Sequence, residues 1–90
     1  MRASYEQAVT LTGDLHARPA GALAVAAAKY SSVVSLTVGA TSADAKSVLG
    51  LMRLGATSGQ HATVAAEGPD AEEAVTTIAA ILTEATRVGA

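Results

Sequence analysis

Three short segments of the sequence alternate apolar and polar side chains, and this pattern constrains the fold more than any other feature. The clearest segment is residues 34–38, in which valine and leucine alternate with serine and threonine. Residues 5–11 and 62–66 have the same period of two, and residues 41–44 have a weaker form of it. A strand with this pattern buries one of its faces. The sequence therefore predicts a single sheet that is covered on one side.

Helical patterns fall between these segments. Residues 17–29 are rich in alanine, the strongest helix former, and Pro19 stands in the first turn, where a missing N–H loses no partner. Ser47 can cap a second, shorter helix, and Gly55 stands where a left-handed residue is expected to end it. These helices are expected to cover the buried face of the sheet.

A third helix is expected after residue 70. Asp70 and Glu73 have the spacing of a capping box, so we expect the Asp70 side chain to cap this helix. Apolar residues recur at helical spacing over residues 74–85, and Arg87 suits the negative end of the helix dipole. The predicted order is therefore strand, helix, strand, a short edge strand, helix, strand and helix.

The composition excludes several classes of site. Residues 1–90 are expected to form one domain with a thin core, because 22 of the 45 hydrophobic residues are alanine. The chain has no cysteine, which rules out disulfides, thiolate metal sites and a cysteine nucleophile. Its two histidines have no further histidine or cysteine to complete a zinc site. We therefore expect neither a metal nor another cofactor.

Charge and hydropathy argue against two kinds of partner. The net charge is −2, and the six lysine and arginine residues are scattered, which disfavours binding to nucleic acid. The longest uncharged apolar stretch, residues 19–28, is ten residues long, against the ~20 that cross a bilayer. The first residues do not resemble a signal peptide, so we expect a cytoplasmic protein without membrane insertion.

His16 and Arg18 are the residues best placed for chemistry. His16 directly precedes a predicted helix, whose first unpaired N–H groups attract anions and disfavour a positive imidazolium. A neutral, nucleophilic ring thus meets an anion-binding helix end, and Arg18 can add a charge-assisted hydrogen bond to a phosphoryl oxygen. The alternative is that His16 is a polar cap or a half-buried loop residue and that Arg18 is an ordinary surface cation.

Two blocks of the sequence resemble those of a known family. Leu15-His16-Ala17-Arg18-Pro19-Ala20 is similar to the phosphohistidine loop of HPr, the phosphocarrier of the bacterial phosphoenolpyruvate-dependent sugar phosphotransferase system. Residues 45–55 are similar to the family's regulatory-serine segment. The interval between the blocks and the order of the elements also match, across essentially all 90 residues.

The resemblance implies an α+β fold, an open-faced β-sandwich in which three helices cover one face of a four-stranded antiparallel sheet. It implies that His16 takes a phosphoryl group on Nδ1 from phosphorylated enzyme I and passes it to enzyme II A components during sugar uptake. Arg18 would hold the phosphoryl oxygens, with the N–H groups of Ala17 and Arg18 completing the cradle. Such a protein is a phosphoryl carrier rather than an independent catalyst, and Mg²⁺ belongs to enzyme I.

Two residues before His16 depart from the family pattern. The family usually carries glycine where this chain has Asp14, whose charge would repel a phosphoryl group unless it points away. The preceding position often holds a small hydrogen-bonding side chain, and here it is Gly13, which loses one possible contact. Both changes bear on the rate of transfer and on the lifetime of the phosphohistidine.

The short second helix is a candidate docking surface. It is apolar almost all round, although a helix over a sheet buries only one stripe, and we expect Leu51 and Leu54 to supply that stripe. The resemblance implies that its other residues dock on enzyme I and the enzyme II A component, with a basic residue meeting an acidic partner. These residues are Val48, Leu49, Met52 and Arg53.

Ser47 has two compatible interpretations. It is a good N-cap, and in some lineages of the family the matching serine is phosphorylated by an ATP-dependent kinase. A phosphate at a helix N-cap is electrostatically favoured and would put negative charge into the docking surface. Ser47 is therefore also a candidate regulatory residue, and a serine kinase a candidate partner.

A second hypothesis for the whole chain is a regulatory interaction module of the HPr type. Such a module would dock through its short helix, either in a nitrogen-related branch or under the control of Ser47, with little or no sugar-transport flux. His16 with Arg18 favours the carrier, because a pure docking module needs neither. The sequence contains no signal for oligomer formation, so a monomer is expected.

Overall fold

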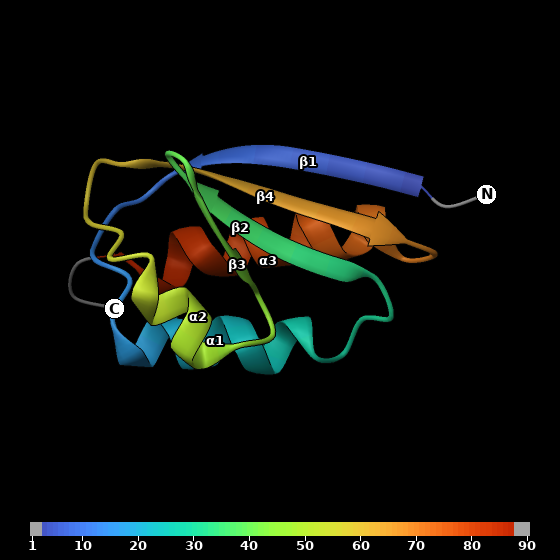
Figure 1. Ribbon diagram of the computed structural model, residues 1–90, viewed down its shortest axis with the longest axis horizontal. Coiled ribbons are helices and arrows are strands. Elements are labelled where there is room, and N and C mark those ends of the chain that lie inside the picture. Colours follow the sequence, from blue (N-terminus) through green and yellow to red (C-terminus); the bar gives the residue numbers. More distant parts are fainter. Residues whose placement is uncertain (1–2, 88–90) are drawn as a thin grey trace.

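The computed structural model describes residues 3–87, and their four strands and three helices follow the predicted order (Figure 1). The elements are β1 (Ala3–Thr10), α1 (Ala17–Ala27), β2 (Val33–Val38), β3 (Thr41–Asp44), α2 (Val48–Arg53), β4 (His61–Gly68) and α3 (Ala71–Ala85). Residues 1–2, on which the expectation about a signal peptide partly rests, and residues 88–90 lie outside the described range. Among the described residues, no helix has the length and apolar character that a membrane crossing requires.

The strands form one antiparallel sheet in the order β1-β4-β2-β3. Figure 1 shows the three helices on one side of this sheet, while its other side is uncovered. The predicted α+β architecture, an open-faced β-sandwich, is therefore confirmed. The weak pattern at residues 41–44 forms β3, which is an edge strand as predicted.

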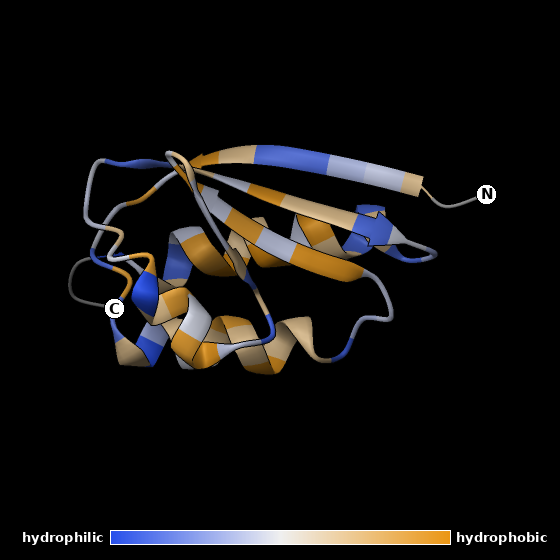
Figure 2. Cartoon of the chain, viewed as in Figure 1, coloured by the Kyte–Doolittle hydropathy of each residue, from blue (hydrophilic) through white to orange (hydrophobic). Residues whose placement is uncertain are grey.

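The alternation along the central strands places their apolar side chains in the core. Val34 and Leu36 on β2 and Val64 on β4 are almost completely buried, and they pack with Leu23 of α1 and Ile78 of α3 in one cluster. Figure 2 shows the resulting bands of hydrophobic and hydrophilic residues along the strands. Burial of each large side chain contributes about 1.5–3 kcal/mol, so this cluster is the main source of stability.

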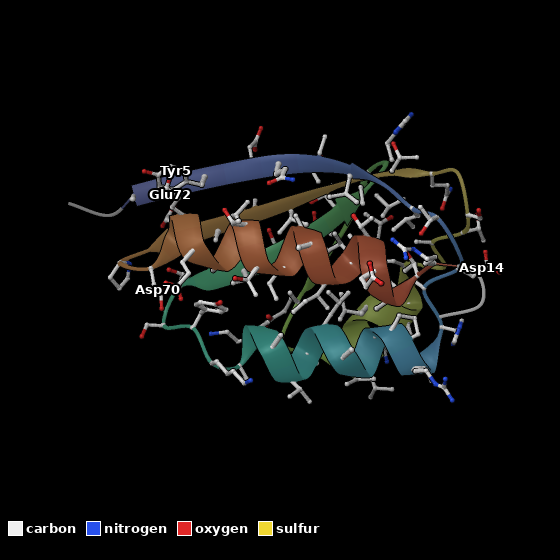
Figure 3. The ribbon with its side chains drawn as sticks, turned by 180° about the vertical axis from the view of Figure 1, so that it is seen from behind. Tyr5, Asp14, Asp70 and Glu72 are labelled. Atoms are coloured by element: carbon white, nitrogen blue, oxygen red, sulfur yellow. The ribbon has the colours of Figure 1, made fainter. Side chains whose placement is uncertain are left out.

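The first strand follows its predicted pattern less closely. Only Val9 is buried within β1, followed by Leu11 just beyond it, whereas Tyr5 is 42% exposed. The reason is that β1 is an edge strand, flanked by β4 alone. Figure 3 shows Tyr5 beside Glu72, at the N-terminal end of α3.

The predicted capping box at the start of α3 is wrong. Asp70 is the N-cap residue of α3, but its side chain makes no capping hydrogen bond. Its two carboxylate oxygens instead accept the backbone N–H groups of Ser31 and Ser32, each at 2.9 Å, and one of them also accepts the Ser32 hydroxyl. Ser32 is fully buried, and a buried donor needs a partner, so the carboxylate serves the loop between α1 and β2.

The described helix ends differ only slightly from those expected. Helix α1 ends at Ala27, two residues earlier than expected, and the chain continues through Lys29 in a turn. At the end of α3, Arg87 pairs with Glu84 at 3.1 Å on the surface. Such exposed pairs contribute little to stability.

Candidate functional site

His16 occupies the N-cap position of α1, where the sequence predicts it. Its backbone is extended, with φ −96° and ψ −168°, and its carbonyl oxygen accepts the Ala20 N–H at 3.0 Å. Its side chain makes no capping hydrogen bond and is exposed, so the alternative of a side-chain cap or a half-buried loop residue is wrong. The imidazole therefore stands in solvent at the beginning of an eleven-residue helix.

The first turn of α1 has the electrostatic character of an anion site. Its first backbone N–H groups have no acceptor within the helix, and they carry the positive end of the helix dipole. The turn contains no acidic residue that would neutralise this end. Ala17 and Arg18 are exposed, whereas Pro19 and Ala20 are buried and hold the turn on the core.

Arg18 lies two residues after His16 on the exposed side of the same turn. Within residues 3–87 it has no ion-pair partner, so its guanidinium is available to an incoming anion. The structure therefore brings together the imidazole, the helix end and the cation that the sequence predicts.

The segment before His16 packs on the C-terminal end of α3. The Thr12 hydroxyl donates to the Thr83 carbonyl at 3.1 Å and lies 3.4 Å from the Thr86 hydroxyl. A Cβ atom at Gly13 would lie 1.8 Å from the Thr86 carbonyl oxygen. This close approach explains the glycine, which the sequence alone presents only as a lost contact.

Asp14 lies on the other side of the same segment. Its Oδ1 atom accepts the Ser58 backbone N–H at 2.9 Å, so the carboxylate is engaged by the chain that follows α2. Figure 3 shows Asp14 at the end of the molecule where α1 begins.

Ser47 caps α2 as predicted. Its hydroxyl oxygen accepts the Gly50 N–H at 3.0 Å, and Gly55 after the helix has a left-handed φ of +60°. Ser47 is partly exposed at the start of the six-residue helix. A cap of this kind typically stabilises a helix by about 1 kcal/mol.

The outer surface of α2 is apolar. Leu51 is completely buried and Leu54 is packed against the core, as expected. Three side chains point outward, and Arg53 is exposed beside them. The exposed fractions are 39% for Val48, 68% for Leu49 and 43% for Met52.

One exposed apolar residue on α1, the helix that packs beside α2, escaped the sequence analysis. Val25 is 67% exposed, and α1 packs beside α2 (Figure 1). Val25 lies seven residues after Arg18, a spacing that places both on one helix face. This seven-residue interval could have indicated from the sequence that Val25 is exposed. The apolar character of the whole segment concealed it.

The second histidine lies outside this site. His61 is exposed on β4, as predicted, and its Nδ1 atom lies 3.0 Å from the Thr10 hydroxyl on β1. The described part of the chain contains no group of three or more histidine, aspartate or glutamate residues that could hold a metal ion.

A hollow in the described part of the surface lies on the uncovered face of the sheet. Its volume is about 290 Å³, and Ser4, Val33, Ser35 and Glu67 are among its lining residues. Ser4 stands at the beginning of β1, whereas the segment leading to His16 follows the end of that strand. This hollow is therefore separate from the site around His16.

Comparison with known proteins identifies the family. Residues 4–84 match the family model described as the PTS HPr component phosphorylation site. The phosphocarrier protein HPr of Vibrio cholerae is 38% identical over 80 residues, which cover 87% of this chain and 94% of that protein.

Solved structures agree with this assignment. A phosphocarrier protein HPr from Bacillus anthracis superposes with a TM-score of 0.83 at 30% identity, covering 89% of this chain and 98% of its own. The Bacillus subtilis catabolite repression protein Crh, whose crystal structure is a domain-swapped dimer, gives 0.74 at 36% identity, covering 87% and 90%. The chain therefore belongs to the HPr family, the phosphocarrier proteins of the bacterial phosphotransferase system that serves sugar transport.

Proposed function

We propose that His16 is the phosphorylation site of this protein and that its Nδ1 atom carries the phosphoryl group. The position of His16 carries this proposal, because an exposed imidazole precedes a helix whose first turn has no acidic residue. Phosphorylated enzyme I is the proposed donor, and the A component of an enzyme II is the proposed acceptor.

Transfer to His16 requires the imidazole tautomer with its proton on Nε2, which leaves the Nδ1 lone pair free. This lone pair attacks the phosphorus atom of the donor, and a P–N bond forms as the bond between phosphorus and the donor breaks. The electron pair of the broken bond stays with the donor. In the second step, an acceptor atom attacks the same phosphorus, and the electron pair of the P–N bond returns to Nδ1.

The surroundings of His16 suit a group that is held briefly. In our proposal, the N–H groups of Ala17 and Arg18 and the Arg18 guanidinium contact the phosphoryl oxygens. A helix end contributes about 0.3–1 kcal/mol at an exposed site and up to ~2 kcal/mol at a partly buried one. This attraction steadies the phosphoryl group without trapping it.

The exposed side chains of α2 are the proposed docking surface for both partners. Apolar side chains that are exposed together on a small domain are typical of an interaction site. They adjoin α1, so a partner seated on them would also reach the helix that begins at His16. The residues are Val48, Leu49, Met52 and Arg53.

Ser47 supports a second, regulatory function. It is partly exposed and directly precedes Val48 of the docking surface. Phosphorylation of Ser47 by a serine kinase would place a charge of about −2 there. In the regulatory alternative, this charge controls docking, or the protein serves a nitrogen-related branch, and phosphorylation of His16 is secondary or absent.

The proposal is tested with phosphoenolpyruvate, enzyme I and the purified protein. We expect one phosphoryl group per chain, detected by intact mass and lost on acid treatment. His16→Ala should abolish this adduct, whereas His61→Ala is the matched control and should retain it. Arg18→Ala should slow its formation, because the phosphoryl oxygens lose a charge-assisted donor.

Two results would overturn this assignment. An acid-labile adduct that persists in His16→Ala would place the phosphoryl group on another residue. An adduct that is stable to acid and lost only in Ser47→Ala would favour the regulatory function. Transfer onward is tested by adding an enzyme II A component and following the loss of label from this protein.

We also propose that the protein acts as a cytoplasmic monomer. Relatives in the family include dimers, among them an HPr from Thermoanaerobacter tengcongensis. Sedimentation across a range of protein concentrations distinguishes the two states. A mass of twice that of one chain at every concentration would contradict the monomer.

A further inference from the structure

The chain that follows α2 makes a tight turn over residues 57–60. The Gln60 N–H donates to the Thr57 carbonyl at 3.1 Å, and Gly59 has a φ of +89°. These features are those of a type II turn, in which Ser58 is the second residue and Gly59 the third. The Thr57 N–H is taken by the Gln60 side chain at 2.8 Å, which closes the turn on itself.

Backbone hydrogen bonds join this turn, and Ala56 directly before it, to both ends of residues 11–15. At one end, Leu11 exchanges two bonds with the turn, donating to Gln60 and accepting from Gly59, each at 2.9 Å. At the other end, the Leu15 N–H donates to the Ala56 carbonyl at 3.0 Å. His16 directly follows Leu15, so these bonds fix the backbone that leads into His16.

Asp14 provides the remaining contact between these two segments. Its Oδ1 atom accepts the Ser58 N–H at 2.9 Å, in the interval between the backbone bonds of Leu11 and Leu15. The Asp14 side chain is exposed, so this bond and not burial defines its role. Thr12 and Gly13 meet the end of α3, so the segment before His16 is held on two sides.

We propose that Asp14 is a positioning residue for His16, acting through its bond to the Ser58 amide. This inference rests on the proposed function of His16. A bond to an ionised acceptor is stronger than a neutral one, and it restrains the backbone two residues before the reacting ring. Holding a nucleophile near its reactive geometry raises the rate of attack. The bond also orients the charged carboxylate of Asp14 toward the Ser58 N–H.

The type of turn allows the Ser58 N–H donor to be removed by a single substitution. Proline is favoured at the second position of a type II turn and has no N–H. Ser58→Pro is therefore expected to keep the turn while deleting the hydrogen bond to Asp14. Ser58→Ala keeps the N–H and is the matched control. On the acceptor side, Asp14→Ala deletes the bond, and Asp14→Asn retains an oxygen at the same place.

We expect Asp14→Ala and Ser58→Pro each to lower kcat for phosphorylation by enzyme I about fivefold, the factor that one net hydrogen bond provides. KM should not change, because the docking residues of α2 are untouched. The double variant should be no slower than either single variant, because both remove the same bond. Ser58→Ala should keep the wild-type rate, and Asp14→Asn, which offers a neutral acceptor in place of the charged one, should lie between the wild type and Asp14→Ala.

A second measurement separates this inference from the function on which it rests. The His16 ring resonances in unphosphorylated protein should shift in Asp14→Ala and Ser58→Pro, and stay at the wild-type position in Ser58→Ala. If enzyme I does not phosphorylate the wild type, the proposed function fails. The His16 ring resonances still test the positioning role in that case, because they are measured on unphosphorylated protein. Wild-type kcat in folded Asp14→Ala, or unchanged ring resonances, would overturn the positioning role alone.

Discussion

The carboxylate of Asp70 and the hydroxyl of Ser32 form a reciprocal pair. The Ser32 hydroxyl and its N–H both donate to Oδ1 of Asp70, and the Asp70 N–H donates back to the same hydroxyl at 3.2 Å. The pair ties the loop between α1 and β2 to the start of α3, where Figure 3 shows Asp70.

This pair predicts a pH dependence of stability. The Ser32 hydroxyl, followed by the Ser31 N–H, lowers the pKa of Asp70 below its ordinary value of 3.8. A carboxyl whose pKa is lowered by folding stabilises the protein above its unfolded pKa, and this contribution is lost as the pH falls through the folded pKa. Urea unfolding from neutral pH to below 3.8 should therefore show a larger loss of stability in wild type than in Asp70→Asn.

Two serine variants serve as controls for this prediction. Ser32→Ala removes the donor with the largest effect and should raise the pKa of Asp70 toward its ordinary value. Ser31→Ala keeps the backbone N–H and should leave that pKa where it is. Titration of the Asp70 carboxyl carbon by NMR measures both, and an equal pKa in wild type and Ser32→Ala would contradict the assignment.

A side chain at Gly13 should destabilise the protein. A Cβ atom there would lie 1.8 Å from the Thr86 carbonyl oxygen, so Gly13→Ala must move the end of α3 or the segment before His16. We expect a loss of about 1–3 kcal/mol in the free energy of unfolding. The matched control is Gly21→Ala in α1, where a Cβ atom meets nothing within 4 Å and should add about 0.5–1 kcal/mol. Equal effects of the two substitutions would contradict the close approach.

The cap at the start of α2 predicts different effects on stability for two substitutions of Ser47. Ser47→Ala removes the acceptor for the Gly50 N–H and should cost about 1 kcal/mol in thermal or urea unfolding. Ser47→Asp retains an acceptor oxygen and should keep wild-type stability, while its charge raises the KM for enzyme I. A KM unchanged in Ser47→Asp would separate Ser47 from the docking surface.

The exposed leucine of α2 should contribute to docking but not to folding. Leu49 is 68% exposed, so Leu49→Ala should change the free energy of unfolding by less than about 0.5 kcal/mol. The KM for enzyme I should rise about tenfold if Leu49 is a central contact. Val33→Ala, at a comparably exposed residue of β2, is the control and should leave KM unchanged. Equal KM values for the two variants would remove Leu49 from the interface.

Local patterns in the sequence determined the elements of this protein and the position of His16 at the start of α1. The alternation at residues 34–38 sets which side chains of β2 are buried, and the alanine-rich run after His16 sets where α1 begins. Ser47 and its helix lie within a few residues of each other, so the cap was also predictable. These features depend on neighbours in the chain, and periodicity and capping preferences describe such neighbours directly.

The tertiary structure alone decided which distant groups hold these elements together. Asp70 has the spacing of a capping residue, yet its carboxylate binds Ser32, which is 38 residues away, because a buried amide and hydroxyl there need an acceptor. Asp14 binds the N–H of Ser58, 44 residues away, and the carbonyl of Thr86 just after α3 leaves room only for glycine at position 13. No local pattern encodes these pairings, since they arise only when packing of the core brings separate segments of the chain into contact.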